Sequence, residues 1–246
     1  MPFDLSLAGA AWLAFAVFGA ALVRGYSGFG FSALVVAGSA LVTNPLNLVA
    51  VVMLCEMVMS LQAWRGLRCQ IDWRVVRLLM AGAVIGLPPG LWLLVSLSED
   101  AARAAISGFI LAMCLVLGFG WRMRAAPGGW AVFAAGMASG AANAPGMGGL
   151  PVAAFFAAQP IPAGVFRATL VAFFPLLDLY SAPLYWLSGL LTWQSVYATL
   201  FALPLIALGN HLGSRRFLAA DPKEFRRFAI GLLAVLSTMG LVKALI

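Results

Sequence analysis

Long apolar runs separated by short polar loops are the feature that most constrains this chain. A helix needs about 20 apolar residues to cross the roughly 30 Å hydrocarbon core of a bilayer. Only 9% of the residues are charged and 63% are hydrophobic, whereas a soluble domain averages about 25% charged residues. The pattern therefore predicts an all-α polytopic membrane protein. The apolar segments lie at 5–23, 30–42, 46–64, 75–97, 102–121, 130–142, 149–158, 163–187, 193–210 and 227–245.

The basic residues indicate how these segments are oriented. Three loops hold 11 of the 15 Lys and Arg residues, and by the positive-inside rule these loops are cytoplasmic. The loop at 98–101 is acidic and the loop at 188–192 is uncharged, which fits the outside. Both termini are then external. We expect a multi-pass protein of the bacterial inner membrane. The basic loop residues are Arg65, Arg68, Arg74 and Arg77, then Arg122 and Arg124, then Arg215, Arg216, Lys223, Arg226 and Arg227.

Several other classes of protein do not fit. The net charge of +7 does not indicate a nucleic-acid partner, because that would need a solvated basic face. The three cysteines form no CxxC motif, and the lone His211 has no carboxylate pair nearby. Walker A, GxSxG and HExxH motifs are missing from the sequence. We therefore expect no enzymatic activity, no catalytic residue, no cofactor and no metal.

Three of the apolar segments are too short to cross a membrane alone. The segments 30–42, 130–142 and 149–158 each adjoin a glycine-rich stretch, GYSGFG at 25–30 or GAANAPGMGG at 140–149. The loop orientations require an odd number of crossings between residues 123 and 190, where three segments lie. A re-entrant hairpin satisfies both facts: 130–142 enters, 143–149 turns and 150–158 returns. The alternative is that all three segments cross the membrane fully, because three is also an odd number of crossings.

The two halves of the chain share this layout. Ser27-Gly28-Phe29-Gly30 precedes Pro145-Gly146-Met147-Gly148 by 118 positions, and Asn44-Pro45 precedes Gln159-Pro160 by 115. Each half has an odd number of crossings, so the halves have opposite orientations. We predict two inverted repeats, at 1–124 and 125–246, within one transmembrane domain. In transporters of this kind, paired Gly/Pro-interrupted segments point to the substrate site.

The interrupted helices are the first candidate for a binding site. Helix ends at membrane depth must line a cavity or be buried in protein, and a restarted helix offers unpaired amides to an anion. Close helix packing is the alternative role for such glycines. Polar side chains beside the breaks, Ser27 and Asn143, are candidate contacts. The glycines concerned are Gly28, Gly30, Gly146, Gly148 and Gly149.

Four ionisable residues lie in or beside apolar segments. Arg24 follows the first segment directly, so it is either a membrane-interior binding residue or an ordinary cytoplasmic flank. Arg167 is a second candidate for the anion, although it can also reach the interface by snorkelling. Glu56 and Asp178 lie within full-length spans that follow the short segments. They are candidates for proton coupling or for structural pairing with the two arginines.

Two stretches carry a resemblance to a known family. GYSGFGFSALVVAGSALVTNP in the first half and GAANAPGMGGLPVAAFFAAQPIP in the second resemble the TauE/SafE sulfite exporter family of permeases, over nearly the whole chain. The first motif, Gly28-Phe29-Gly30-Phe31, departs from the richer glycine run common in that family. The resemblance implies secondary transport of sulfite, sulfonates, sulfoacetate or related organic anions, with export favoured.

The sequence thus predicts a secondary-active transporter that works by alternating access. Its expected partners are a small anionic substrate, the lipid bilayer and protons as candidate coupling ions. Two other functions stay open. One is an intramembrane enzyme acting on lipid, which would need an acid–base pair within mutual reach. The other is a membrane assembly protein that transports nothing, which would not need two interrupted helices.

Overall fold

The computed structural model describes residues 6–27, 30–67, 71–119, 123, 127–216, 231, 234–235 and 237–242, without the side chains at 26, 27, 62–67, 163, 167 and 216. The described residues form an all-helical bundle, and residues 237–242 are also helical. The helices are α1 (Leu7–Ser27), α2 (Phe31–Ser39), α3 (Leu46–Leu67), α4 (Trp73–Ser96), α5 (Glu99–Phe119), α6 (Gly129–Asn143), α7 (Gly149–Ala157), α8 (Ala163–Leu187) and α9 (Trp193–Arg216).

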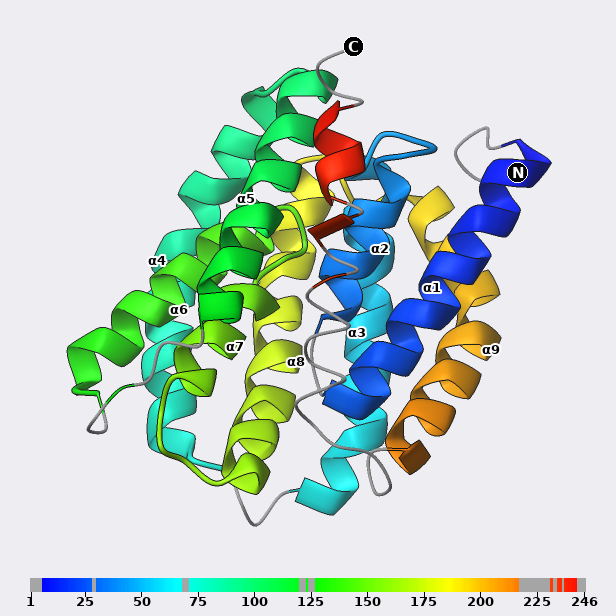
Figure 1. Ribbon diagram of the computed structural model, residues 1–246. Coiled ribbons are helices and arrows are strands. Elements are labelled where there is room, and N and C mark those ends of the chain that lie inside the picture. Colours follow the sequence, from blue (N-terminus) through cyan, green and yellow to red (C-terminus); the bar gives the residue numbers. More distant parts are fainter. Residues whose placement is uncertain are drawn as a thin grey trace.

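The chain passes up and down one bundle axis (Figure 1). Helix α1 descends from the upper end in that view, α2 returns toward it, and α3 descends again. The upper end also holds the α4–α5 and α8–α9 connections, while the lower ends of α3 and α9 lie opposite. The connections at 98–101 and 188–192 thus lie at one end of the bundle, and the ends of α3 and α9 lie at the other.

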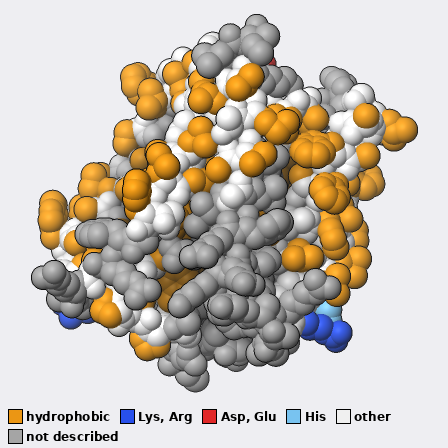
Figure 2. All heavy atoms as spheres, viewed as in Figure 1, with side chains coloured by type: hydrophobic (Ala, Val, Ile, Leu, Met, Phe, Trp, Pro, Cys, Tyr) orange, Lys and Arg blue, Asp and Glu red, His pale blue; other side chains and the backbone are white. Residues whose placement is uncertain are grey.

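Apolar side chains cover the outside of the bundle. Five described helical stretches are long and apolar enough to cross a membrane, which confirms a multi-pass protein: Leu7–Gly25, Trp73–Ser96, Glu99–Phe119, Gly164–Leu187 and Trp193–Arg215. Figure 2 shows hydrophobic side chains over the visible face, with the visible Lys and Arg atoms at its lower edge. Exposed tryptophans lie at helix ends, as at an interfacial aromatic belt: Trp73, Trp92, Trp130, Trp186 and Trp193.

Two of the short helices form a hairpin. Helix α6 has 15 residues and measures about 22 Å at 1.5 Å per residue, so it cannot span a bilayer. Helix α7 has 9 residues and packs back against α6. The bounds agree closely with the predicted entering and returning segments. In the first half the 9-residue α2 packs against α1 in the same way.

The first helix extends beyond its apolar segment at a position that matters for the site. In the sequence, Arg24 directly follows an apolar segment that ends at residue 23. Helix α1 instead continues to Ser27, and Arg24 occupies its last turn. The helix persists because Arg24 is buried against α3 rather than facing water, so its charge does not end the apolar segment.

The longest contacts between helices are made in three pairs. Helix α4 packs on α6, and α1 packs on α9; α3 and α8 cross at the centre. Both outer pairs depend on glycine. A methyl group on Gly86 of α4 would collide with the carbonyl oxygen of Met137 on α6, and one on Gly25 of α1 would collide with that of Asn210 on α9. Close backbone approach through small residues is a common basis of helix association in membranes.

This packing predicts that Gly86→Val lowers the stability of the protein strongly, whereas the same substitution at Gly108 leaves it unchanged. Gly86→Val forces the α4 and α6 backbones apart, and overpacking of this kind costs about 1–3 kcal/mol or more. Gly108 also lies within a helix, but a methyl group there meets nothing within 4 Å. We expect Gly86→Val to lower the melting temperature of the detergent-purified protein by several degrees and Gly108→Val to leave it unchanged. Equal melting temperatures would contradict the close α4–α6 contact.

Candidate functional site

A buried ion pair lies where α1 meets α3. Nη1 of Arg24 is 2.7 Å from Oε1 of Glu56, and Nη2 of Arg24 donates a hydrogen bond of 2.8 Å to Oγ of Ser60. Glu56 and Ser60 are four residues apart, so both face α1 from one side of α3. Arg24 is 5% and Glu56 8% exposed. The structural pairing that the sequence left open for these two residues is therefore confirmed.

The pair does not use all the hydrogen-bonding capacity of Arg24. Although Nη1 is close to Glu56, its N–H groups are not aligned with the carboxylate, and Nη1 has no hydrogen-bond partner among the described residues. The guanidinium also lies over the ring of Phe174, with Cζ 5.9 Å from the ring centroid. Such a cation–π contact is attractive. The guanidinium thus retains donors that an anion can use.

Asp178 brings a second carboxylate to the same place. It lies on α8, is 3% exposed, and interacts electrostatically with both Glu56 and Arg24. Within the part of the chain that the structure describes, its Oδ2 has no hydrogen-bond partner. The two carboxylates therefore differ: Glu56 is paired with a cation, whereas Asp178 has a free acceptor oxygen. Burying a charged oxygen without a hydrogen bond is costly.

The second helix interruption is held in place by hydrogen bonds to α8 and within the hairpin. Tyr185 of α8 donates from its hydroxyl to the main-chain oxygen of Asn143, the last residue of α6. Ser139 Oγ donates to the carbonyl oxygen of Gly148 at 2.6 Å. Gly146 has φ +77°, a left-handed conformation that favours glycine. In the described structure Nδ2 of Asn143 has no hydrogen-bond partner, so a buried donor also remains free here.

The glycines of this turn allow tight contacts on two sides. A methyl group at Gly148 would lie 2.7 Å from Oδ1 of Asn143, and one at Gly149 would lie 3.4 Å from Cζ of Phe174. Gly149 is the first residue of α7. Phe174 therefore lies close to the start of α7 as well as to Arg24. One aromatic ring thus links the second interruption with the Arg24–Glu56 pair.

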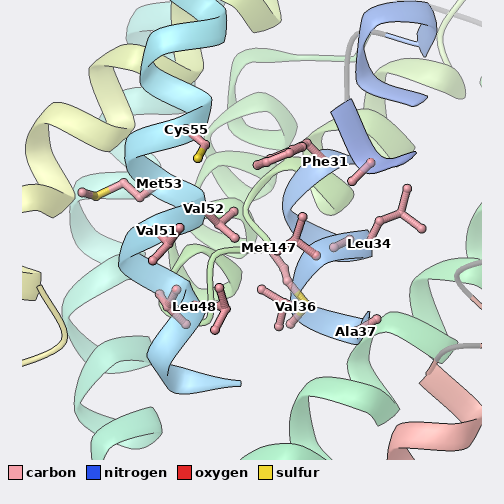
Figure 3. Packing of buried hydrophobic residues seen from close by; sticks show 14 of the residues in the cluster. Phe31, Leu34, Val36, Ala37, Leu48, Val51, Val52, Met53, Cys55 and Met147 are labelled. Atoms are coloured by element: carbon pink, nitrogen blue, oxygen red, sulfur yellow. The ribbon is translucent and has the colours of Figure 1, made fainter. Parts of the chain in front are cut away.

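The tip of the α6–α7 turn inserts into the other half of the molecule. Met147 is fully buried and belongs to an apolar cluster with residues of α2 and α3. Figure 3 shows its side chain between Val36 of α2 and Val52 of α3. Phe31, the first residue of α2, lies in the same cluster. The two interrupted regions are joined through this apolar packing.

The structure describes only some of the predicted site residues. Gly30 is described, with φ +92° at the N-cap of α2, which explains a glycine there. Gly28 and the side chains of Ser27 and Arg167 lie outside the described residues. Of the predicted residues, the structure brings together Arg24, Glu56, Asp178, Asn143, Gly148 and Gly149, through direct contacts or through Phe174 and Tyr185.

Three residues of this cluster were not among the predicted ones. Ser60 lies one turn after Glu56 on α3, and Phe174 lies one turn before Asp178 on α8. Tyr185 lies two turns after Asp178. Helical periodicity around the two carboxylates was the signal that could have found them, since residues 3, 4 or 7 apart share a helix face. Among 17 Phe residues, composition alone does not single out Phe174.

The described residues do not form a metal site. No group of three or more His, Cys, Asp and Glu side chains that could hold a metal ion occurs among the described residues. The arrangement instead offers a cation at Arg24, an amide donor without a partner at Asn143 and the start of α7. Groups of this kind bind anions.

Comparisons with known proteins identify the family. No curated protein matches the chain, and no solved structure matches it. The family model described as sulfite exporter TauE/SafE matches residues 13–239, which is most of the chain and includes both interrupted regions. This chain therefore belongs to the TauE/SafE sulfite exporter family of membrane transporters.

Proposed function

We propose that this transporter carries a small sulfur oxyanion or organic anion, such as sulfite, a sulfonate or sulfoacetate, out across a bacterial inner membrane. The observation that supports this best is the buried Arg24, whose Nη1 has no hydrogen-bond partner among the described residues and whose guanidinium lies over Phe174. Arginine presents a planar fork of donors that suits an oxyanion. Further contacts come from Asn143 and from the helix start at Gly148 and Gly149.

Asp178 is the better candidate for carrying a coupled proton. Glu56 balances the charge of Arg24 within the ion pair, so Asp178 adds a net negative charge to the centre. An anion that binds nearby is repelled by this charge unless a proton neutralises it. Binding of one anion then goes together with uptake of one proton, and the two cross the membrane together. Net export takes place when the outward gradient of the anion exceeds the opposing gradient of the proton. Glu56 serves instead as the counter-ion that keeps Arg24 charged and in place, and the two carboxylates have separate roles.

Alternating access follows if the halves 1–124 and 125–246 are inverted repeats. The proposal is supported by the pairing of α4 with α6 and of α1 with α9, since an inverted repeat makes α4 correspond to α9 and α6 to α1. It is also supported by the position of the two buried carboxylates, because Glu56 and Asp178 lie near the middle of the long helices α3 and α8. Rocking of one repeat against the other would expose this centre to each side in turn.

A ligand panel tests the proposed substrate class. The purified protein is titrated with sulfite, methanesulfonate, sulfoacetate and acetate, and its melting temperature is measured with sodium chloride at equal ionic strength as the control. A ligand at 100 times its Kd stabilises the folded state by about 2.7 kcal/mol. We expect at least one sulfur oxyanion to raise the melting temperature by several degrees. Identical curves for every anion and for chloride would contradict the proposal.

The orientation of the chain is tested by labelling intact cells. In a variant without the native cysteines, we expect a membrane-impermeant maleimide to label Ser98→Cys, at the α4–α5 connection. Arg215→Cys, at the end of α9, becomes labelled only after the membrane is permeabilised. Both positions are exposed, so accessibility within the protein does not limit the reaction. Labelling of Arg215→Cys in intact cells would show that the basic loops are external.

A further inference from the structure

Phe174 packs close to two groups that can bind an anion. The Arg24 guanidinium lies over its ring, and a methyl group added at Gly149, the first residue of α7, would come within van der Waals reach of the ring. The residue is 3% exposed. It lies one helical turn before Asp178, so both project from the same face of α8. An aromatic ring therefore packs close to a cation and to a helix start, although both attract anions.

Three buried polar groups of the candidate site have no hydrogen-bond partner in the described part of the chain. They are Nη1 of Arg24, which forms only the ion pair with Glu56, Nδ2 of Asn143 and Oδ2 of Asp178. Each of these three side chains is more than nine-tenths buried. Buried polar groups are nearly always hydrogen-bonded, and the exceptions need an explanation. The ring of Phe174 gives Arg24 a cation–π contact, but a hydrocarbon ring accepts no conventional hydrogen bond.

We propose that Phe174 is the gate of the anion site: its ring fills the site when no substrate is bound and leaves it when an anion enters. This inference rests on the proposed function of the Arg24 site. An oxyanion in place of the ring can accept hydrogen bonds from Arg24 and from the start of α7. The cation–π contact thus keeps Arg24 partnered in the empty state, and the anion replaces it in the bound state.

The size of the residue at 174 then determines which anions the site accepts. The ring must find room elsewhere when a substrate binds, so the space that it leaves limits the size of the organic group on the anion. A smaller side chain at 174 relaxes that limit. Removing the ring also removes the cation–π contact, which an anion must otherwise displace before it binds. Both effects act on anion affinity, and they can be separated with two variants.

The experiment compares two sulfonates that differ only in chain length, methanesulfonate and butanesulfonate, by calorimetric titration of folded, purified protein. In Phe174→Ala we expect the ratio of the butanesulfonate Kd to the methanesulfonate Kd to fall about tenfold or more, within the range that pocket size gives for alkyl substrates. Phe174→Leu keeps most of the apolar volume and removes the aromatic ring. We expect it to bind both anions about three- to tenfold more tightly, because no cation–π contact has to be displaced.

Phe173 supplies the matched control. It is the adjacent residue on α8, is fully buried, and packs in the same apolar cluster as Phe174. Phe173→Ala creates a similar cavity, so we expect a similar loss of thermal stability with the Kd ratio unchanged. A Kd ratio that falls equally in Phe173→Ala and Phe174→Ala overturns the gate. So does a Phe174→Leu protein with wild-type affinity for both anions.

The outcomes also separate this inference from the function on which it rests. If the wild-type protein binds neither sulfonate nor sulfite, the proposed function is wrong and the gate falls with it. A second outcome is that the wild type binds methanesulfonate while all three variants have the same Kd values as the wild type. In that case the anion site stands and the role of Phe174 is wrong. Phe174→Leu is a mild substitution within an apolar cluster, so it still decides the question if Phe174→Ala does not fold.

Discussion

Replacing Arg24 by alanine should weaken anion binding at least about tenfold, because a charge-assisted hydrogen bond contributes about 1.5–3 kcal/mol. The same change should also destabilise the fold. Glu56 would be left buried without its cation, and removing one partner of a buried ion pair costs about 3–5 kcal/mol. A single variant therefore confounds binding with folding. Calorimetric titration with sulfite and a melting curve are needed on the same preparation.

A double variant separates the two effects. Arg24→Met with Glu56→Gln removes both charges and keeps most of the buried volume, and such replacements of a buried pair are often neutral or stabilising. We expect its melting temperature to return to near the wild-type value while sulfite binding stays at least about tenfold weaker. Arg24→Lys should restore binding only in part, since a point charge replaces a fork of donors. Wild-type affinity in the double variant would remove Arg24 from the site.

The second large effect is expected at Asp178. Asp178→Asn keeps the shape of the side chain but cannot take up a proton. We expect it to abolish accumulation of substrate driven by a pH gradient in proteoliposomes, while exchange of substrate for substrate continues, since exchange moves no net proton. Because Oδ2 has no hydrogen-bond partner among the described residues, the substitution breaks no contact of that oxygen. The folded variant is therefore a fair test of proton coupling.

Glu56→Gln is the matched comparison for this test. It also replaces a buried carboxylate by an amide, but it removes the counter-ion of Arg24. We expect it to lower thermal stability and to leave pH-driven accumulation present at a reduced rate. If Glu56→Gln alone abolishes accumulation while Asp178→Asn transports like the wild type, the roles of the two carboxylates are the reverse of those proposed.

Much of the fold could be predicted from the sequence, because membrane insertion depends on length and hydrophobicity. The hairpin at α6 and α7 followed from segments too short to span, and its turn lies between residues 143 and 149 as expected. Helix α1 continues past the end of its apolar segment, which local hydrophobicity could not show because the continuation depends on tertiary pairing. Arg24 interrupts an apolar segment in sequence, but Glu56 and Ser60 of α3 satisfy it within a helix.

The site was predictable in its residue types and less so in its contacts. Charged residues in apolar segments are costly and therefore few, so Arg24, Glu56 and Asp178 could be named directly. Which carboxylate pairs with Arg24 depends on how α1, α3 and α8 cross, and no local pattern encodes that. Phe174 was missed for a different reason. A phenylalanine in an apolar helix is ordinary, and only its contact with Arg24 and its place near the start of α7 make this one distinctive.

Counterflow of radiolabelled sulfite in proteoliposomes tests the central claim most directly. Vesicles loaded with unlabelled sulfite take up labelled sulfite only if the protein binds the anion and exposes its site to both sides. We predict rapid uptake with the wild type and with Asp178→Asn, and background uptake with the Arg24→Met/Glu56→Gln variant. Background uptake of sulfite and of the sulfonates by the wild type, or undiminished counterflow by the double variant, would contradict an anion transporter centred on Arg24.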